Sequence, residues 1–249
     1  MFVVDLLHEF ELGVWKTIFT HLMRILNAIG GNAVHDLNER YRQVPPFGNG
    51  VIRRFTGNPS AMRKLAARDF EDLLQVCNPQ PFDVSPYLII YTQCALPVFE
   101  DQLRTQRENS FLRSLLFDLA TWHAFAKLRL HTDTTLNDFK TVTTTLGKTV
   151  RTFIKEVCSL YDTTELPHEM AARGRREAAL TNRSGTMPVG ASQRRLKSSR
   201  KEINLSTYKY HALGDYPDLI ARFGTTDNAS TQTVSFFIQK YAMSLRHRR

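Results

Sequence analysis

The stretch LGVWKTIFTHLMRILNAI, residues 12–29, decides how the N-terminal part of the chain folds. Its large apolar side chains recur at steps of three and four residues: Leu12, Trp15, Phe19, Leu22, Leu26 and Ile29. That spacing places them on one face of an α-helix and leaves the polar residues on the other face. Gly30 and Gly31 follow, and glycine commonly ends a helix. The stretch therefore predicts an amphipathic helix that ends at residue 29.

Two longer stretches show the same period. Residues 108–130 and 134–161 each carry a continuous apolar face, which predicts two long helices. Asp133 or Thr134 is the expected N-cap of the second helix, because short polar side chains accept hydrogen bonds from the first backbone amides. These two helices and a shorter helix expected at residues 60–75 are expected to pack together as the stable part of the fold.

Shorter helices complete the predicted architecture. They are expected at residues 34–42, 60–75, 167–181 and 204–223. Ser60 follows Asn58-Pro59 and is the expected N-cap of its helix. The apolar run Phe2–Val4 is typical of the end of a buried strand, and a β-like run, Tyr87–Tyr91, lies between two helical segments. The predicted fold class is therefore mostly α.

Length and composition indicate a folded intracellular protein. Of the 249 residues, 42% are hydrophobic and 23% are charged, so one large domain or two small ones can bury a core. The three cysteines have no paired spacing, which argues against a disulfide scaffold and a zinc finger: Cys77, Cys94 and Cys158. We expect no membrane partner, because no run of roughly 18 apolar residues occurs and the N-terminus has no basic signal segment.

Positive charge is concentrated in one segment. Residues 167–202 hold nine Lys or Arg and three acids, a net charge of +6 out of the total of +9. Because Lys and Arg displace counterions from phosphates, this segment is a candidate nucleic-acid contact. The candidate DNA-binding residues are Arg173, Arg175, Arg176, Arg194, Arg195, Lys197, Arg200 and Lys201. A solvated linker is the alternative, and residues 184–199 are the best candidate for disorder.

Four pieces of the chain resemble one known family. They are VDLLHEFELGVWK (residues 4–16), RYRQVP (40–45), KLAARDFEDLLQ (64–75) and YKYHALGDY (208–216). Together they resemble the Plavaka transposases, which are CACTA-like DDE transposases of mushroom-forming fungi. The resemblance extends from residue 2 to about residue 232, apart from residues 76–93. It implies DNA as the partner and the nucleus as the location.

The resemblance also implies a fold and a site. The fold would be a helical insertion domain attached to a remnant of an RNase H-like transposase core. Asp5 would be the second catalytic aspartate and a metal ligand, with His8 one helical turn on beside the site. In the intact family three acids would hold Mg²⁺, because a pair of metal ions activates the attacking hydroxyl and stabilises the leaving oxygen. His211 and Asp215 could approach the same helix.

Without the resemblance, the Asp5-x-x-His8 motif has a simpler interpretation. It is typical of an N-cap aspartate followed by an exposed histidine on the first helical turn. Glu9 and Glu11 would then suit the positive end of the helix dipole. A metal site built on the scattered histidines is not supported, because none of them has the spacing of paired ligands.

Two departures from the family limit the expected activity. The chain begins just before Asp5, so the first catalytic aspartate is missing. Residues 233–244 diverge from the family, and if the terminal LRHRR is the remnant of the family's LEHRR, Arg246 stands where the family has the glutamate that would be the third acid. We therefore expect an incomplete, catalytically inactive fragment that holds no Mg²⁺. The alternatives are a non-catalytic helical protein that binds nucleic acid or a partner, and a wrongly predicted gene product without function.

An insert of eighteen residues, 76–93, interrupts the resemblance. It begins with Val76, whose codons begin with GT, and ends with Gln93, one of whose codons ends with AG, as in an intron. We hypothesise that residues 76–93 are a translated intron and that residues 234–244 are a second one. The chain then divides into a core end and first helix (1–30), a helical domain with the insert (31–166), a basic arm that is partly disordered (167–202), and a C-terminal helix with a divergent tail (203–249).

Overall fold

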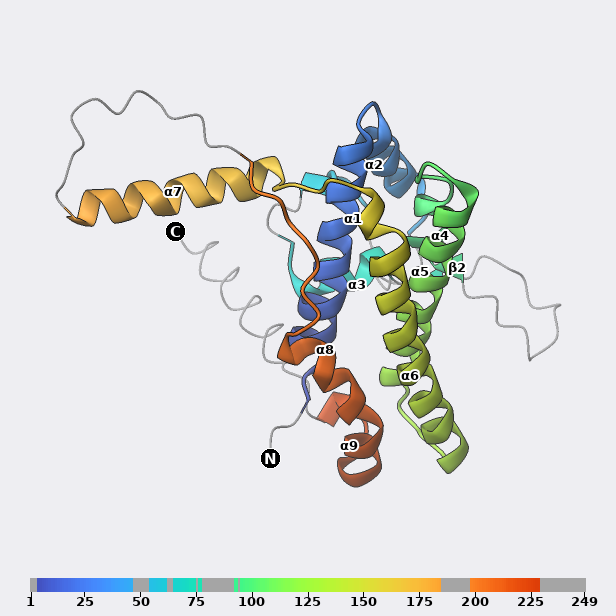
Figure 1. Ribbon diagram of the computed structural model, residues 1–249. Helices are drawn as coiled ribbons and strands as arrows, with labels where there is room; N and C mark the ends of the chain where they lie inside the picture. The colour runs from blue at the N-terminus through green and yellow to red at the C-terminus, as the bar shows by residue number, and fades with distance from the viewer. Residues whose placement is uncertain are drawn as a thin grey trace, which may run out of the picture.

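The computed structural model describes residues 4–46, 54–61, 65–74, 76–77, 92–93, 95–184 and 198–228 (Figure 1). These residues are mostly helical, which confirms the predicted fold class. Among them, no helix has the length and apolar character needed to cross a membrane. In chain order the elements are η1 (Leu7–Trp15), α1 (Lys16–Ile29), α2 (Ala33–Gln43), η2 (Pro59–Ala61), α3 (Ala67–Leu74), β1 (Val76–Cys77), β2 (Thr92–Gln93), α4 (Ala95–Phe99), α5 (Gln106–Ala126), α6 (Asp133–Glu156), η3 (Cys158–Leu160), α7 (Pro167–Ser184), α8 (Tyr208–Ala212), η4 (Leu213–Asp215), α9 (Tyr216–Phe223) and η5 (Thr226–Asn228).

η1 and α1 form one continuous helix through the middle of the molecule (Figure 1). Trp15 is fully buried, and its indole Nε1 donates a hydrogen bond of 2.8 Å to the carbonyl of Phe70 in α3. Phe19, one turn later, packs edge-on against Tyr41, Phe70 and Phe99. The helix predicted at residues 12–29 is confirmed, but it begins earlier, and η1 is a π-helix. Such helices are rare and frequently lie at functional sites.

α5 and α6 lie side by side as a helical hairpin (Figure 1). The indole Nε1 of buried Trp122 on α5 donates a hydrogen bond of 2.9 Å to Oγ1 of Thr143 on α6. The hydroxyl of Thr149 donates to Oδ2 of Asp118 at 2.6 Å. The two long predicted helices are therefore confirmed, and a single hydrophobic core joins them to η1, α1 and α9.

The predicted cap of α6 is wrong by one residue. Thr132, rather than Asp133 or Thr134, is the N-cap, and its side chain accepts a hydrogen bond of 3.2 Å from the backbone N–H of Thr135. The Thr135 hydroxyl in turn accepts a hydrogen bond of 2.8 Å from the backbone N–H of Thr132. This reciprocal pair satisfies two backbone donors, which a cap at either predicted position would not do.

The predicted cap at Ser60 is also wrong. Ser60 lies in η2, where its hydroxyl accepts a hydrogen bond of 2.8 Å from Asn38 Nδ2 and its backbone N–H donates to Asn38 Oδ1 at 3.2 Å. The helix begins later, at α3, where Asp69 accepts a hydrogen bond of 2.7 Å from the backbone N–H of Ala66. Ser60 thus ties η2 to α2 because its polar atoms are used across the fold.

β1 and β2 are the only strands among the described residues. They pair antiparallel, with Val76 opposite Gln93 and Cys77 opposite Thr92. The two ends of the predicted insert therefore lie side by side, between α3 and α4. Val4 belongs to no strand, so the strand expected at Phe2–Val4 is wrong at its one described residue. The remnant of an RNase H-like core stays a prediction.

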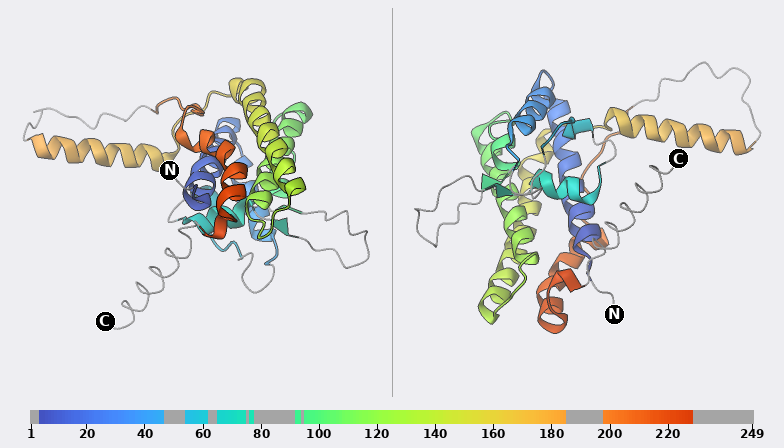
Figure 2. Two further views of the ribbon diagram at one scale, coloured as in Figure 1. Left: turned by 90° about the horizontal axis from the view of Figure 1, so that it is seen from below. Right: turned by 180° about the vertical axis from the view of Figure 1, so that it is seen from behind.

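α7 projects away from the helical body, and the described chain returns to the body from residue 198 onward (Figures 1 and 2). The predicted helix at residues 167–181 is confirmed. From Arg175 to Leu180 every residue is exposed, so this part of α7 is covered by nothing in the described structure. We call α7 the arm. The disorder expected at residues 184–199 falls almost wholly on residues outside the described part of the chain.

Candidate functional site

The Asp5–His8 motif lies at the start of η1. Oδ1 of Asp5 accepts a hydrogen bond of 3.2 Å from the backbone N–H of Leu7, and Oδ2 lies 2.6 Å from Nδ1 of His8. The side chain of His8 is 59% exposed. This geometry is that of an aspartate that satisfies a backbone donor at a helix start, followed by an exposed histidine. The catalytic roles of Asp5 and His8 stay predictions.

Two further acids of the same motif point into the core. Glu9 accepts a hydrogen bond of 3.1 Å from the Tyr216 hydroxyl, and Oε1 of Glu11 lies 3.3 Å from Nε2 of His123. Burial raises the pKa of Glu9, and it raises the pKa of Glu11 to about 8. Burial also lowers the pKa of His123 to about 3. Near neutral pH the Glu11–His123 pair is therefore mostly uncharged.

The surroundings of Glu11 keep water away from it. Phe10 stacks on His123 and on Trp122, with ring centroids 5.1 and 4.7 Å apart. Lys127, whose charge acts on Glu11, forms its ion pair with Glu71. The negative charge of Glu71 raises the pKa of Glu11 further, after burial, while Lys127 lowers it. This cluster is part of the core, and it differs from an open catalytic cleft because it is closed by aromatic rings.

The described residues do not fit the Mg²⁺ ions that the family resemblance implies. No group of three or more His, Cys, Asp or Glu among them is placed to hold a metal ion. Asp5 supplies one carboxylate, and both of its oxygens are engaged by Leu7 and His8. Magnesium needs several oxygen ligands in an octahedral arrangement. We therefore derive no catalytic step through a metal ion.

α8 covers the outer side of η1. Lys209 on α8 lies across η1, and its Nζ donates a hydrogen bond of 3.4 Å to the carbonyl of Leu12. Gly13 makes this approach possible, because a Cβ there would lie 2.7 Å from Cδ of Lys209 and 2.9 Å from the carbonyl oxygen of His8. The glycine of the ELGVW sequence is thus explained by the close passage of α8.

The YKYHALGDY piece approaches the motif. Besides the hydrogen bond from Tyr216 to Glu9, Asp215 is near enough for its charge to raise the pKa of Glu9, after the larger effects of burial and the motif's own Asp5. His211 is exposed. The approach of His211 and Asp215 to a catalytic site stays a prediction, and the contacts described here form a polar seam between η1 and the C-terminal helices.

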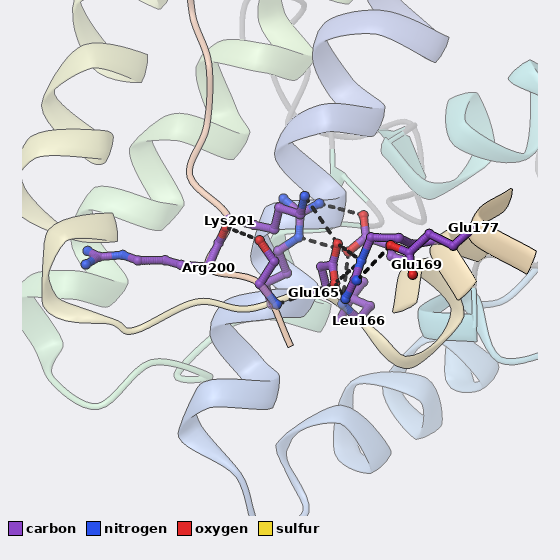
Figure 3. A network of polar contacts seen from close by, with 9 residues as sticks. Glu165, Leu166, Glu169, Glu177, Arg200 and Lys201 are labelled. Carbon is purple, nitrogen blue, oxygen red and sulfur yellow. Dashed lines mark hydrogen bonds and ion pairs between the residues drawn. The ribbon is translucent and has the colours of Figure 1, made fainter. Parts of the chain in front are cut away.

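Glu165 forms the centre of a polar network at the base of the arm (Figure 3). Its side chain is only 4% exposed. Glu165 Oε2 accepts a hydrogen bond of 2.9 Å from Nη2 of Arg173, and Oε1 lies 3.3 Å from Nζ of Lys201. The backbone N–H of Ser199 donates to Glu165 at 3.4 Å. The Arg173 guanidinium holds the pKa of Glu165 at about 2, so the buried carboxylate is charged.

A short ladder joins the chain that enters the arm to the chain that leaves it. Thr164 pairs antiparallel with Arg200, and Glu165 donates its backbone N–H to the carbonyl of Ser199 at 2.9 Å. The backbone N–H of Lys201 donates to the carbonyl of Thr163, also at 2.9 Å. We call residues 163–173 together with residues 199–201 the arm root.

Glu169 attaches the arm root to the central helix. It accepts hydrogen bonds of 2.6 and 3.2 Å from the guanidinium of Arg24 on α1. It also accepts a hydrogen bond of 2.9 Å from the backbone N–H of Leu166, one of the donors left open at the start of α7. Because Glu169 binds both Arg24 on α1 and the backbone at the start of α7, it fixes the position of the first turn of α7 on the body.

The candidate DNA-binding residues divide into three groups. Three of them are engaged in ion pairs at or near the arm root: Arg173, Arg200 and Lys201. Two are exposed on the arm and form no ion pair within the described part of the chain: Arg175 and Arg176. Three lie outside the described residues: Arg194, Arg195 and Lys197. Only the second group is both placed by the structure and open to a partner.

Glu165 is the residue that sequence reasoning missed. It is the acid just before residues 167–202, and its partners Ser199 and Lys201 are 34 and 36 residues away in sequence. The only local signal was an acid eight residues before Arg173. Comparison with known proteins adds no further residue: the chain matches no protein-family model, no curated protein and no solved structure.

Proposed function

We propose that this chain is a non-catalytic helical part of a Plavaka-like DDE transposase and that it contacts DNA through the arm. The observation that supports this proposal best is the helix α7, which projects from the body (Figures 1 and 2). Arg175 and Arg176 on this helix are exposed. The proposal places the chain in the nucleus. In this proposal the chain binds DNA and does not cleave DNA strands.

The chemistry of the arm favours contact with the phosphate backbone. Guanidinium groups donate paired hydrogen bonds to phosphate oxygens and stay charged at all physiological pH values. The arm contains no Phe, Tyr or Trp, so it offers no aromatic ring on which an exposed base could stack. Contacts of this kind position a protein on the duplex without reading its sequence. We therefore expect binding that depends little on base sequence.

Charge reversal on the arm tests the proposal. The variant Arg175→Glu/Arg176→Glu should bind a short DNA duplex at least about tenfold more weakly, measured by fluorescence anisotropy, because two charge-assisted phosphate contacts are lost. The matched control is Lys148→Glu/Arg151→Glu, which reverses two exposed cations on α6. Both variants lower the net charge from +9 to +5.

The comparison of the two variants separates a located contact from general attraction. The control should weaken binding by no more than about twofold, because long-range attraction depends on net charge and is screened by salt. An equal loss in both variants would show that net charge alone attracts the DNA. Unchanged binding in the arm variant would contradict the proposal outright.

A further inference from the structure

Two cations of the basic segment, Arg173 and Lys201, are used within the arm root, where they pair with Glu165. Glu165 is almost wholly buried, and it is surrounded by the guanidinium of Arg173, the ammonium of Lys201 and the backbone N–H of Ser199 (Figure 3). A buried carboxylate is stable only when it is paired and hydrogen-bonded. Arg173 and Lys201 therefore have a structural role, which is to neutralise the buried Glu165 carboxylate.

The arm needs such a fixed base. Residues 175–180 of the arm are all exposed, so packing against other elements, which supplies most helical stability in proteins, does not hold this part in place. The direction of the arm is therefore set by the contacts that the arm root makes. Glu165 joins the start of α7 to the returning chain, and Glu169 joins the same turn to Arg24 on the central helix.

We infer that Glu165 is a positioning residue for nucleic-acid binding: by holding Arg173 and Lys201 together, it fixes the direction in which the arm presents Arg175 and Arg176. This inference rests on the function proposed above. Fixing the arm before binding lowers the entropy lost when its arginines meet phosphates. Glu165 acts through the arm and makes no contact with the DNA itself.

The sign of one substitution tests this inference. Glu165→Gln removes a negative charge next to a basic arm, so simple electrostatics predicts tighter DNA binding. Loss of the fixed direction predicts the opposite, and we expect binding about fivefold weaker. The matched control is Glu177→Gln on the exposed side of α7, where the side chain is 52% exposed and also faces Arg173. It should bind as tightly as the unmodified chain or more tightly.

Hydrogen exchange on the intact chain supplies a second readout. In Glu165→Gln the backbone amides of α7 should exchange faster, while those of α5 and α6 should not change. If Glu165→Gln does not fold, Glu169→Gln tests the attachment of the same helix start, because it removes the charge that pairs with Arg24 while the amide oxygen can still accept from the backbone N–H of Leu166. It should also weaken DNA binding and speed exchange in α7.

The outcomes are distinguishable. Weaker binding by Glu165→Gln with faster exchange confined to α7 supports the inference. Binding equal to or tighter than that of the unmodified chain overturns it, provided that reversal of Arg175 and Arg176 still weakens binding. If that reversal has no effect, the proposed DNA contact itself is wrong.

Discussion

Two buried glutamates of this molecule differ in charge near neutral pH: Glu165 is ionised, and Glu11 is protonated. Glu165 at the arm root and Glu11 in the core are both almost wholly buried, with side chains 4% and 2% exposed. Arg173 holds the pKa of Glu165 at about 2, whereas burial raises the pKa of Glu11 to about 8. Burial alone therefore does not decide the charge of an acid, and the partners that reach it do.

The partners differ because of where each glutamate lies. Glu165 lies where two chain segments meet, so cations from both of them reach it. Glu11 faces the interior, where its carboxyl lies 3.3 Å from His123, Phe10 stacks on that imidazole, and Lys127 is paired with Glu71. The arm root is thus held by charged pairs, whereas the Glu11–His123 contact in the core is neutral. The predictions below test this difference, beginning with the largest effect.

Removing the aromatic cover of Glu11 should have the largest effect. Phe10→Ala should lower the free energy of unfolding by about 3–5 kcal/mol, because it deletes a fully buried ring and opens a cavity beside His123. Urea unfolding measures the change. The control Phe117→Ala removes a ring that is 55% exposed and should cost less than about 1 kcal/mol. Equal costs would show that Phe10 is not part of a packed core.

The raised pKa of Glu11 predicts how stability changes with pH. Between pH 4.5 and 8 the unfolded chain has released a proton that the folded chain keeps, so stability falls as pH rises through this range. From pH 6.5 to 8 the loss should be about 1 kcal/mol, because His123, which is half protonated at pH 6.5 in the unfolded chain and neutral in the folded one, offsets part of the Glu11 effect. Glu11→Gln should remove most of this slope, as measured by urea unfolding at several pH values. A variant with the same slope would contradict the assignment.

Glu165 should show the reverse dependence. Its pKa is lowered, so its contribution is present above pH 4.5 and is lost as the pH falls from 4.5 toward 2. The protection of the α7 amides, which is their exchange rate relative to the intrinsic rate at the same pH, should therefore fall over this range. The measurement should be repeated with Glu165→Gln, in which the change should be absent because no proton is taken up at that position.

Deletion of residues 76–93 should have the smallest effect. Val76 lies opposite Gln93, so a chain that joins Gln75 directly to Cys94 has only the width of a strand pair to cross. The free energy of unfolding should change by about 1 kcal/mol or less, with both pH dependences preserved. A loss of folding would show that the insert is part of the structure and would count against a translated intron.

The helices could be predicted from the sequence because their signal is local. The steps of three and four residues in LGVWKTIFTHLMRILNAI and in residues 108–130 specify helices without reference to the rest of the chain. The same reasoning placed the two helix caps wrongly, because residue type alone does not show which hydrogen bonds a side chain makes. Thr132 caps α6 through its exchange with Thr135, and Ser60 bonds to Asn38 on another helix.

The buried acids could not be predicted in this way. Glu11 meets His123 across 112 residues, and Glu165 meets Lys201 only because the chain returns from the arm. The charge of residues 167–202 indicated a phosphate contact but did not say which cations are open to a partner. The structure makes that distinction for Arg175 and Arg176 because it shows where Arg173 and Lys201 are used.

The salt dependence of DNA binding tests the central claim most directly. The observed binding constant of the intact chain for a short duplex should fall linearly with salt on a log–log plot, because phosphate contacts release counterions. The slope should be shallower by about 2 in Arg175→Glu/Arg176→Glu, one for each lost phosphate contact. The same slope in both proteins, or binding that does not depend on salt, would contradict a DNA contact through the arm.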